Sequence, residues 1–225
     1  MPRFSLVMFD LDGTLVDTAQ DIASALNATL TEAGLAPLAT EVVVGYIGNG
    51  AARLIERALP PVAVAGPRPD IDALVRRFKA HYAAHVCEHS VVYPGIAALL
   101  KRLGSQVPLA VLTNKPGVLA RSLLKALGVD GCFAHIIGDG DGFQRKPAPD
   151  AARWLIAQHK LSPAAAVLVG DGLPDIQVAR AAGCAVASVT WGYTSPAVLQ
   201  AEAPTFMLET PTAVGDLIVD GRVID

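Results

Sequence analysis

The chain has 225 residues and a formal net charge of −3 at pH 7, with 52% hydrophobic and 17% charged residues. This composition permits a well-filled core and excludes wholesale disorder. The slightly acidic balance offers no general attraction for nucleic acid, and no apolar stretch approaches the roughly 20 residues that span a bilayer, so neither nucleic acid nor a membrane is expected as a partner.

The cysteines indicate a reducing compartment. Cys87, Cys132 and Cys184 are odd in number and show no paired spacing, so we expect neither a disulfide framework nor a zinc site. The start of the chain carries one arginine and a short apolar run that Asp10 interrupts, which is not the pattern of a signal peptide. We therefore expect a cytoplasmic protein.

The first predicted element is a buried strand over Phe4–Phe9, and two carboxylates follow it directly in the run Asp10-Leu11-Asp12-Gly13-Thr14. In an open α/β sheet, residues at the carboxyl end of a strand lie where ligands bind. Gly13 permits a tight turn. The alternative interpretation is an ordinary turn with solvated acids.

The next stretch, residues 17–88, contains no convincing strand. Apolar residues recur at helical spacing at Ile22, Leu26 and Leu30, and a second amphipathic stripe begins at Ile71, beyond a segment rich in proline and glycine at 60–69. We predict a small all-helical cap domain over 17–88, inserted after the first strand into a core domain formed by 1–16 and 89–225.

From residue 89 onward, strand and helix patterns alternate. The pattern predicts strands at Leu109–Leu112, His135–Ile137, Val167–Val169 and Ala185–Val189, with helices at Pro94–Leu103, Pro116–Leu127, Asp150–His159 and Asp175–Ala182. Apolar strands that alternate with helices indicate a parallel sheet covered on both faces. The predicted fold class is therefore α/β, with a Rossmann-like parallel sheet as its core.

Three further places carry polar side chains suited to phosphate or metal. Thr113 and Asn114 follow the second predicted strand at the start of a helix, where an anion can bind. Lys146 lies beside another helix start, and Asp171 and Asp175 follow an apolar strand. Two of these places have a plain alternative: a helix cap for Thr113 and a solvated surface charge for Lys146.

Several acids brought to one sheet edge repel one another, and a hard divalent cation removes that repulsion. Oxygen ligands with room for water and phosphate favour Mg²⁺, which can also neutralise charge on a transferring phosphoryl group. A carboxylate is ionised at neutral pH and can attack phosphorus without first losing a proton.

Taken together, Asp10-x-Asp12-Gly13-Thr14, Thr113-Asn114, Lys146-Pro147 and Gly170-Asp171-x-x-x-Asp175 resemble the four motifs of the haloacid dehalogenase superfamily, in the right order over essentially the whole chain. The resemblance implies that Asp10 is the nucleophile and a magnesium ligand. It implies that Asp12 is the general acid and base and offers its main-chain carbonyl to the metal, that Asp171 and Asp175 complete the metal site, and that Lys146 steadies Asp10 and the phosphate.

By the same resemblance, Thr113 and Asn114 hold the phosphate oxygens. Many superfamily members carry serine or threonine where this chain has Gly172, so one hydroxyl contact in the metal loop is expected to be missing. The segment Trp191-Gly192-Tyr193 is expected to pack a loop near the site.

The cap segment resembles that of bacterial superfamily members that hydrolyse 2-phosphoglycolate, which is the expected substrate. Gly48, Asn49 and Gly50 could present backbone N–H groups and an amide to a small carboxylate, and Arg53 could add charge. The alternative is a helix-breaking turn with Arg53 solvated.

Two other functions stay open: a phosphatase or mutase for another small phosphorylated metabolite, such as a sugar phosphate or pyrophosphate, and a catalytically silent binding protein. The expected state is a monomer or a homodimer.

Overall fold

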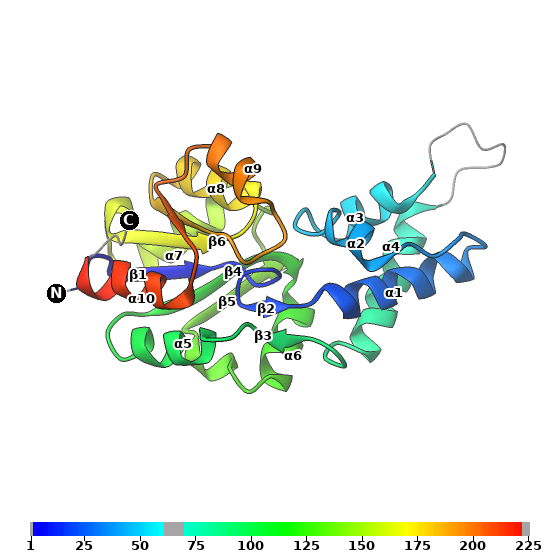
Figure 1. The fold of residues 1–225 in the computed structure, drawn as a ribbon, viewed down its shortest axis with the longest axis horizontal. Helices are drawn as coiled ribbons and strands as arrows, with labels where there is room; N and C mark the ends of the chain where they lie inside the picture. The colour runs from blue at the N-terminus through cyan, green and yellow to red at the C-terminus, as the bar shows by residue number, and fades with distance from the viewer. Residues whose placement is uncertain (1, 61–69, 222–225) are drawn as a thin grey trace.

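A computed structural model describes residues 2–60 and 70–221 of the chain. In these ranges six parallel strands form the main sheet, in the order β5-β4-β1-β6-β7-β8 (Figure 1). The strands are β1 (Leu6–Phe9), β4 (Leu109–Pro116), β5 (His135–Asp139), β6 (Ala166–Gly170), β7 (Ala185–Val189) and β8 (Phe206–Leu208). The predicted α/β fold with a Rossmann-like parallel sheet is confirmed.

Helices cover both faces of this sheet because its strands are apolar on both sides. Along β1, Val7 and Phe9 belong to one hydrophobic cluster, whereas Leu6 and Met8 belong to another, as the two-residue period of a strand requires. The first cluster is completed by α5 (Ile96–Gly104), α6 (Gly117–Ala126) and α10 (Pro211–Asp220), and the second by α7 (Asp150–Gln158), α8 (Leu173–Ala182) and α9 (Pro196–Ala201). Two 3₁₀ turns, η1 (Asp130–Cys132) and η2 (Pro163–Ala165), complete the core.

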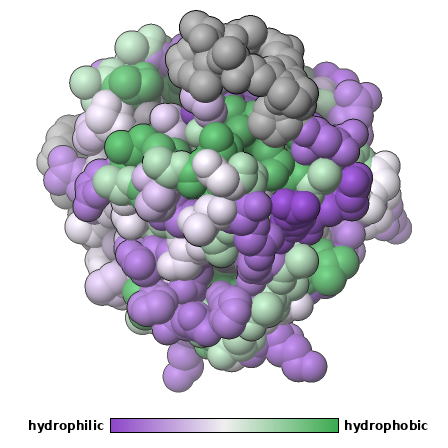
Figure 2. Space-filling model, turned by 90° about the vertical axis from the view of Figure 1, so that its right-hand side faces the viewer, coloured by the Kyte–Doolittle hydropathy of each residue, from purple (hydrophilic) through white to green (hydrophobic). Residues whose placement is uncertain are grey.

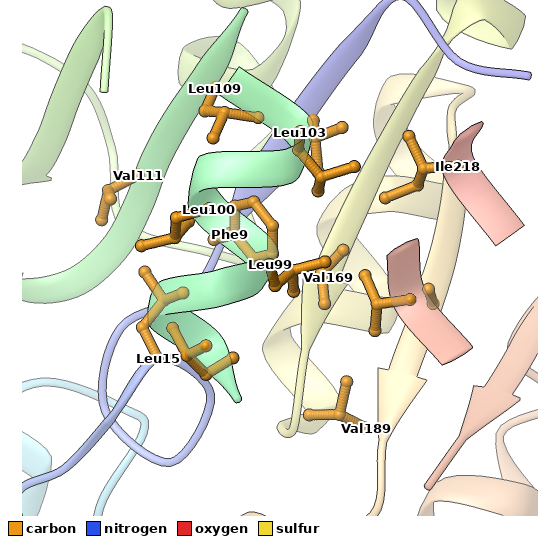
Figure 3. Packing of buried hydrophobic residues seen from close by; sticks show 14 of the residues in the cluster. Phe9, Leu15, Leu99, Leu100, Leu103, Leu109, Val111, Val169, Val189 and Ile218 are labelled. Carbon is orange, nitrogen blue, oxygen red and sulfur yellow. The ribbon is translucent and has the colours of Figure 1, made fainter. Parts of the chain in front are cut away.

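Figure 3 shows how the first cluster is assembled. Phe9 of β1 and Val169 of β6 face Leu99 and Leu103 of α5, with Ile218 of α10 beside them. All five side chains are buried, so the strand that carries Asp10 at its end is held by packing from two separate helices. A rigid first strand positions the residues that follow it.

The cap segment, as we call residues 17–88, is helical in its described part. It contains α1 (Ala19–Glu32), α2 (Thr40–Val44), α3 (Ala51–Ala58) and α4 (Ile71–Ala84), and these helices share a hydrophobic cluster to which Leu119 of core helix α6 also belongs. They lie beyond one end of the sheet, far from both chain termini (Figure 1). Seen from that end, an apolar band crosses a surface of otherwise mixed polarity (Figure 2).

Some elements differ from the sequence predictions. A short antiparallel ribbon of β2 (Val16–Asp17) and β3 (Val91–Val92) joins the cap segment to the core, where no strand was predicted. Strand β8 and helices α9 and α10 were also not predicted. The proline- and glycine-rich stretch at 61–69 lies outside the described residues. In the described part of the chain, no helix has the length and apolar character needed to cross a membrane.

Candidate active site

The candidate site lies where three neighbouring parallel strands end. Phe9 of β1 is in register with Val111 of β4 and with Val169 of β6. Asp10 therefore leaves the sheet at the same edge as the polar end of β4 and as Asp171, which follows β6. Residues that are about 100 and 160 positions away from Asp10 in the sequence thus meet at one sheet edge.

Three buried acids gather at this edge. Asp10, Asp171 and Asp175 each offer a carboxylate oxygen, and these oxygens lie within 4.8 Å of one another. Burial, followed by the charges of Asp10 and Asp175, raises the pKa of Asp171 to about 7. Burial likewise raises the pKa of Asp175 to about 6, against the opposing charge of Lys146. The geometry fits a hard divalent cation, since every donor is an oxygen and the acids crowd one another without one.

Hydrogen bonds from neighbouring groups hold the carboxylates of Asp171 and Asp175 in place. The hydroxyl of Thr14 donates to Asp171 Oδ1 at 2.7 Å, and the backbone N–H of Tyr193 donates to Asp171 Oδ2 at 2.8 Å. Asp175 Oδ2 accepts from the backbone N–H of Gly172 at 3.0 Å. Gly172 thus contributes through its main chain, even though it lacks the hydroxyl common at this position.

Lys146 supplies the positive charge beside the acids. Its Nζ lies 2.9 Å from Asp10 Oδ1 and 2.6 Å from Asp175 Oδ1, and the side chain is buried. Burial alone would lower the pKa of Lys146, but Asp10 and then Asp175 raise it overall. The ammonium therefore stays charged. The burial of the side chain excludes the alternative of a solvated surface lysine.

Asp12 bonds to a different set of residues. Its Oδ1 accepts from the hydroxyl of Thr18 at 2.8 Å and from Lys115 Nζ at 2.8 Å. Burial alone would lower the pKa of Lys115, but the charge of Asp12 raises it overall. Asp12 is thus held in place as one half of an ion pair and stands apart from the three-acid cluster.

The second predicted motif lies in a strand, not at a helix start. β4 continues to Pro116, so Thr113, Asn114 and Lys115 are part of its end, and α6 begins only at Gly117. The Thr113 hydroxyl accepts from the backbone N–H of Lys115 at 3.2 Å. The amide of Asn114 donates to the carbonyls of Lys146 at 3.1 Å and of Gly48 at 3.0 Å. Asn114 therefore ties the cap segment to the core.

The cap residues proposed for substrate divide into two groups. Gly48 and Gly50 line a cavity between the cap segment and the sheet edge, together with Asp10 and Asp12. Asn49 accepts from Arg57 at 2.7 Å. Arg53 pairs with Glu56 at 2.7 Å, is 67% exposed, and lines a separate hollow that Lys146 also borders. The structure therefore does not bring Arg53 to the cavity between Asp10 and the cap segment.

Several residues at the site were missed from the sequence or given no role there. Lys115, Thr14 and Thr18 each bond directly to a predicted acid, and Tyr193 does so through its backbone. The Trp191 indole N–H donates to the carbonyl of Thr14 at 3.1 Å, so this loop does pack beside the site. For Lys115, the signal was its place directly after Thr113-Asn114, at the same strand end as the predicted ligands.

Known proteins resemble this chain along most of its length. A phosphoglycolate phosphatase of Agrobacterium fabrum is 39% identical over 228 residues, covering 98% of this chain and 97% of its own. One of Pasteurella multocida is 37% identical over 198 residues, covering 86% and 88%. A crystal structure of a predicted phosphoglycolate phosphatase from Haemophilus somnus matches with a TM-score of 0.88 at 32% identity, covering 95% of this chain and 97% of that one.

The family model described as haloacid dehalogenase-like hydrolase matches residues 7–189, a range that includes all but the first residue of β1, all four predicted motifs and the described cap segment. That match spans more than half of the sequence. The chain belongs to the haloacid dehalogenase-like hydrolase family.

Proposed function

We propose that this protein hydrolyses 2-phosphoglycolate to glycolate and phosphate, using Mg²⁺ and an aspartyl-phosphate intermediate on Asp10. The observation that carries the proposal is the surrounding of the Asp10 carboxylate, which lies 2.9 Å from Lys146 Nζ and within 4.8 Å of the oxygens of Asp171 and Asp175. Relatives named phosphoglycolate phosphatase that share 37–39% identity over most of the chain support the choice of substrate.

In the proposed first step, a carboxylate oxygen of Asp10 attacks phosphorus and the bond from phosphorus to the ester oxygen breaks. Asp12, which must carry a proton at this point and not the charge that pairs with Lys115 in the structure, gives that proton to the leaving oxygen, and glycolate departs. Lys146, Thr113 and Asn114 are the groups proposed to bind the phosphoryl oxygens, Asn114 through its backbone N–H because both N–H groups of its side-chain amide are bonded to carbonyls.

In the second step, a water molecule attacks the phosphorus of the aspartyl-phosphate, Asp12 takes a proton from that water, and the bond to Asp10 breaks. This returns Asp10 as a carboxylate, returns Asp12 to its protonated form and releases phosphate. We propose that Asp10, Asp171, Asp175 and the main-chain carbonyl of Asp12 hold the Mg²⁺. When bound, that ion would neutralise charge on the transferring phosphoryl group.

The cap segment is proposed to close over the reaction and exclude bulk water. Gly48, Asn49 and Gly50 remain its predicted substrate contacts, whereas Arg53 would have to leave Glu56 to become one. The division into a core domain of 1–16 and 89–225 and a cap domain of 17–88 is also proposed. Separate hydrophobic clusters in the cap segment and on each face of the sheet support it. We further propose a cytoplasmic protein that acts as a monomer or homodimer; its three unpaired cysteines fit a reducing compartment.

A steady-state screen of phosphorylated metabolites with Mg²⁺ tests the substrate. 2-Phosphoglycolate should have the highest kcat/KM. A higher kcat/KM for a hexose phosphate or for pyrophosphate would contradict 2-phosphoglycolate as the substrate. The Asp10→Asn variant tests the nucleophile, because it should lose turnover while keeping its thermal unfolding transition. Full activity in that variant would mean that a group other than Asp10 attacks phosphorus.

A further inference from the structure

Lys115 is a buried cation that the proposed reaction leaves unused. It lies at the end of β4 and is 7% exposed. Its ammonium lies 2.8 Å from Asp12 Oδ1 and 4.2 Å from the centre of the Tyr82 ring, which belongs to α4 of the cap segment. Lys115 therefore stands where the core meets the cap segment, beside the acid proposed to protonate the leaving group.

The same lysine lines the cavity between cap segment and sheet edge. On the core side this cavity is bordered by Asp10, Asp12 and Thr113, and on the cap side mainly by apolar residues (Ile22, Ile47, Leu54 and Phe78). Among the described residues that line it, Lys115 is the sole cation. The cavity measures about 50 Å³, which is room for roughly three to five water molecules at about 10–15 Å³ each, and so suits a group of a few atoms.

Hydrogen-bond donors of two side chains in this cavity lack an acceptor. The Tyr82 hydroxyl is buried, with the side chain 1% exposed, and it lies beside the Lys115 ammonium, which is a donor and offers no acceptor for the hydroxyl proton. No acceptor for that proton lies within hydrogen-bond distance among the described residues. An ammonium has three donors, and the described residues engage one of those of Lys115 in a hydrogen bond, to Asp12. A buried hydroxyl without a partner is costly, so a ligand atom that accepts from it would remove that cost.

We infer that Lys115, with the hydroxyl of Tyr82, binds the carboxylate of the substrate's leaving group and so makes the enzyme selective for phosphorylated carboxylic acids. A carboxylate can accept from both donors at once while its phosphate end reaches Asp10. This inference deepens the proposed function and rests on it for the site, though not for 2-phosphoglycolate itself.

The other cations near the cavity are less suited to this task. Lys146 is already shared between Asp10 and Asp175, and Arg53 is exposed and paired with Glu56. Arg57 lines a neighbouring cavity with Asp10, Asp12 and Asp171, but it already donates to Asn49 and to the carbonyl of Tyr46. The competing explanation is that Lys115 serves only as the counter-ion of Asp12. That explanation accounts for the ion pair but does not explain why the buried Tyr82 hydroxyl has no hydrogen-bond acceptor.

Paired substrates separate the two explanations. 2-Phosphoglycolate and 2-hydroxyethyl phosphate differ only in a carboxylate against a CH₂OH group, as do 3-phosphoglycerate and glycerol 3-phosphate. Any effect of Lys115 through Asp12 applies to both members of a pair, whereas binding of the carboxylate affects the acid alone. The readout is the ratio of kcat/KM for the acid to that for the alcohol.

Wild-type enzyme should prefer the acid in at least one pair. Lys115→Met should lower that ratio by about 30-fold or more, mainly through the KM of the acid, and Tyr82→Phe should lower it by about 3- to 10-fold. Lys115→Gln removes the charge but keeps a hydrogen-bond donor for Asp12. This variant replaces Lys115→Met in the test if Lys115→Met does not fold. Lys125→Met, the same change at an exposed position of α6, should leave the ratio unchanged.

An equal loss for acid and alcohol in Lys115→Met would overturn the inference and leave Lys115 as the counter-ion of Asp12 alone. Absence of any preference for acids in the wild-type enzyme would also overturn it, even if phosphatase activity remained. If 2-phosphoglycolate were a poor substrate while a preference for 3-phosphoglycerate depended on Lys115, the proposed substrate would fail and the inference would stand.

Discussion

At the scale of single residues, the site holds more negative than positive charge. Asp10, Asp171 and Asp175 are buried within reach of one another, and in the described structure Lys146 is the one cation bonded to this group. Removing the only partner of buried charges destabilises a protein by about 3–5 kcal/mol. We predict that Lys146→Met lowers the free energy of unfolding by about that amount, measured by urea denaturation in buffer without divalent cations.

The comparison for this prediction is Asp10→Asn. That change removes one negative charge and leaves Lys146 paired with Asp175, so it should alter the free energy of unfolding far less, although both variants lose turnover. Equal stability of Lys146→Met and the wild type would mean that water, not Lys146, compensates the acids.

Gly13 is a second residue whose identity the site requires. Its φ is +84°, and a Cβ placed there would overlap the carboxylate of Asp171. We predict that Gly13→Ala displaces Asp171 and weakens the apparent affinity for Mg²⁺ by about tenfold or more, measured as the Mg²⁺ concentration for half-maximal activity.

Gly34 provides a matched control for this change, since it also has a positive φ, +73°, but nothing described lies within 4 Å of its Cβ position. Gly34→Ala should cost about 1–2 kcal/mol in backbone strain and leave the Mg²⁺ dependence unchanged. A shift of equal size in both variants would assign the effect to strain, not to crowding of Asp171.

At the scale of elements, Asp21 joins the first cap helix to the segment that returns to the core. This buried carboxylate of α1 accepts hydrogen bonds from the backbone N–H groups of Glu88, His89 and Ser90 and from the Ser90 hydroxyl, at 2.6–3.1 Å. Burial alone would raise the pKa of Asp21, but the bonds from Ser90 and His89 outweigh it and the pKa is lowered. The folded state therefore favours the ionised carboxylate.

A group with a lowered pKa contributes stability above its unfolded value, about 3.9 for aspartate, and loses that contribution as the pH falls through the folded value. We predict that Asp21→Asn lowers the free energy of unfolding by about 1–3 kcal/mol at pH 7. The difference from the wild type should shrink below about pH 4. Urea denaturation of both proteins at pH 7, 5 and 3 measures it, and a difference independent of pH would exclude the ionised carboxylate as its source.

The elements of the core could be predicted from the sequence because their patterns are local. Apolar strands and capped helices repeat over short windows, so β1, β6 and β7 were expected within a residue or two of their bounds. Strand β8 spans three residues at the sheet edge. Three residues are too few for a sequence pattern that distinguishes a strand from a loop. Likewise β2 and β3 have two residues each and pair across the whole cap segment.

The acids could be predicted because they stand at strand ends or in the first turn of α8, which the sequence marks. Lys146 was expected to open a helix, but α7 begins only at Asp150, and Lys146 lies in the loop before it. Lys115 could not be given its place in this way. Lysine is rarely buried, and its burial here depends on Asp12, 103 positions away, and on the Tyr82 ring of the cap segment. Contacts that depend on how two distant segments meet leave no local pattern.

At the scale of the whole molecule, the cap segment and the core meet around the reacting groups and not at a distant interface. The amide of Asn114 bonds to the carbonyl of Gly48, and the ammonium of Lys115 lies against the ring of Tyr82. On the opposite side, the hydroxyl of Tyr193 accepts from the backbone N–H of Thr18, directly before α1. These contacts attach the cap segment to the sheet edge at the residues around the reacting groups.

The same geometry couples metal binding to the stability of the fold, because the three acids are brought together only in the folded state. A ligand that binds only the folded chain stabilises it by about 2.7 kcal/mol at a concentration 100 times its Kd. At about 2–4 °C per kcal/mol for a chain of this size, we predict that saturating Mg²⁺ raises the Tm by roughly 5–10 °C. Asp171→Asn should lose most of this rise, whereas Asp72→Asn, the same change at an exposed position of α4, should keep it. Thermal unfolding with and without Mg²⁺ measures both, and an undiminished rise in Asp171→Asn would place the ion elsewhere in the protein.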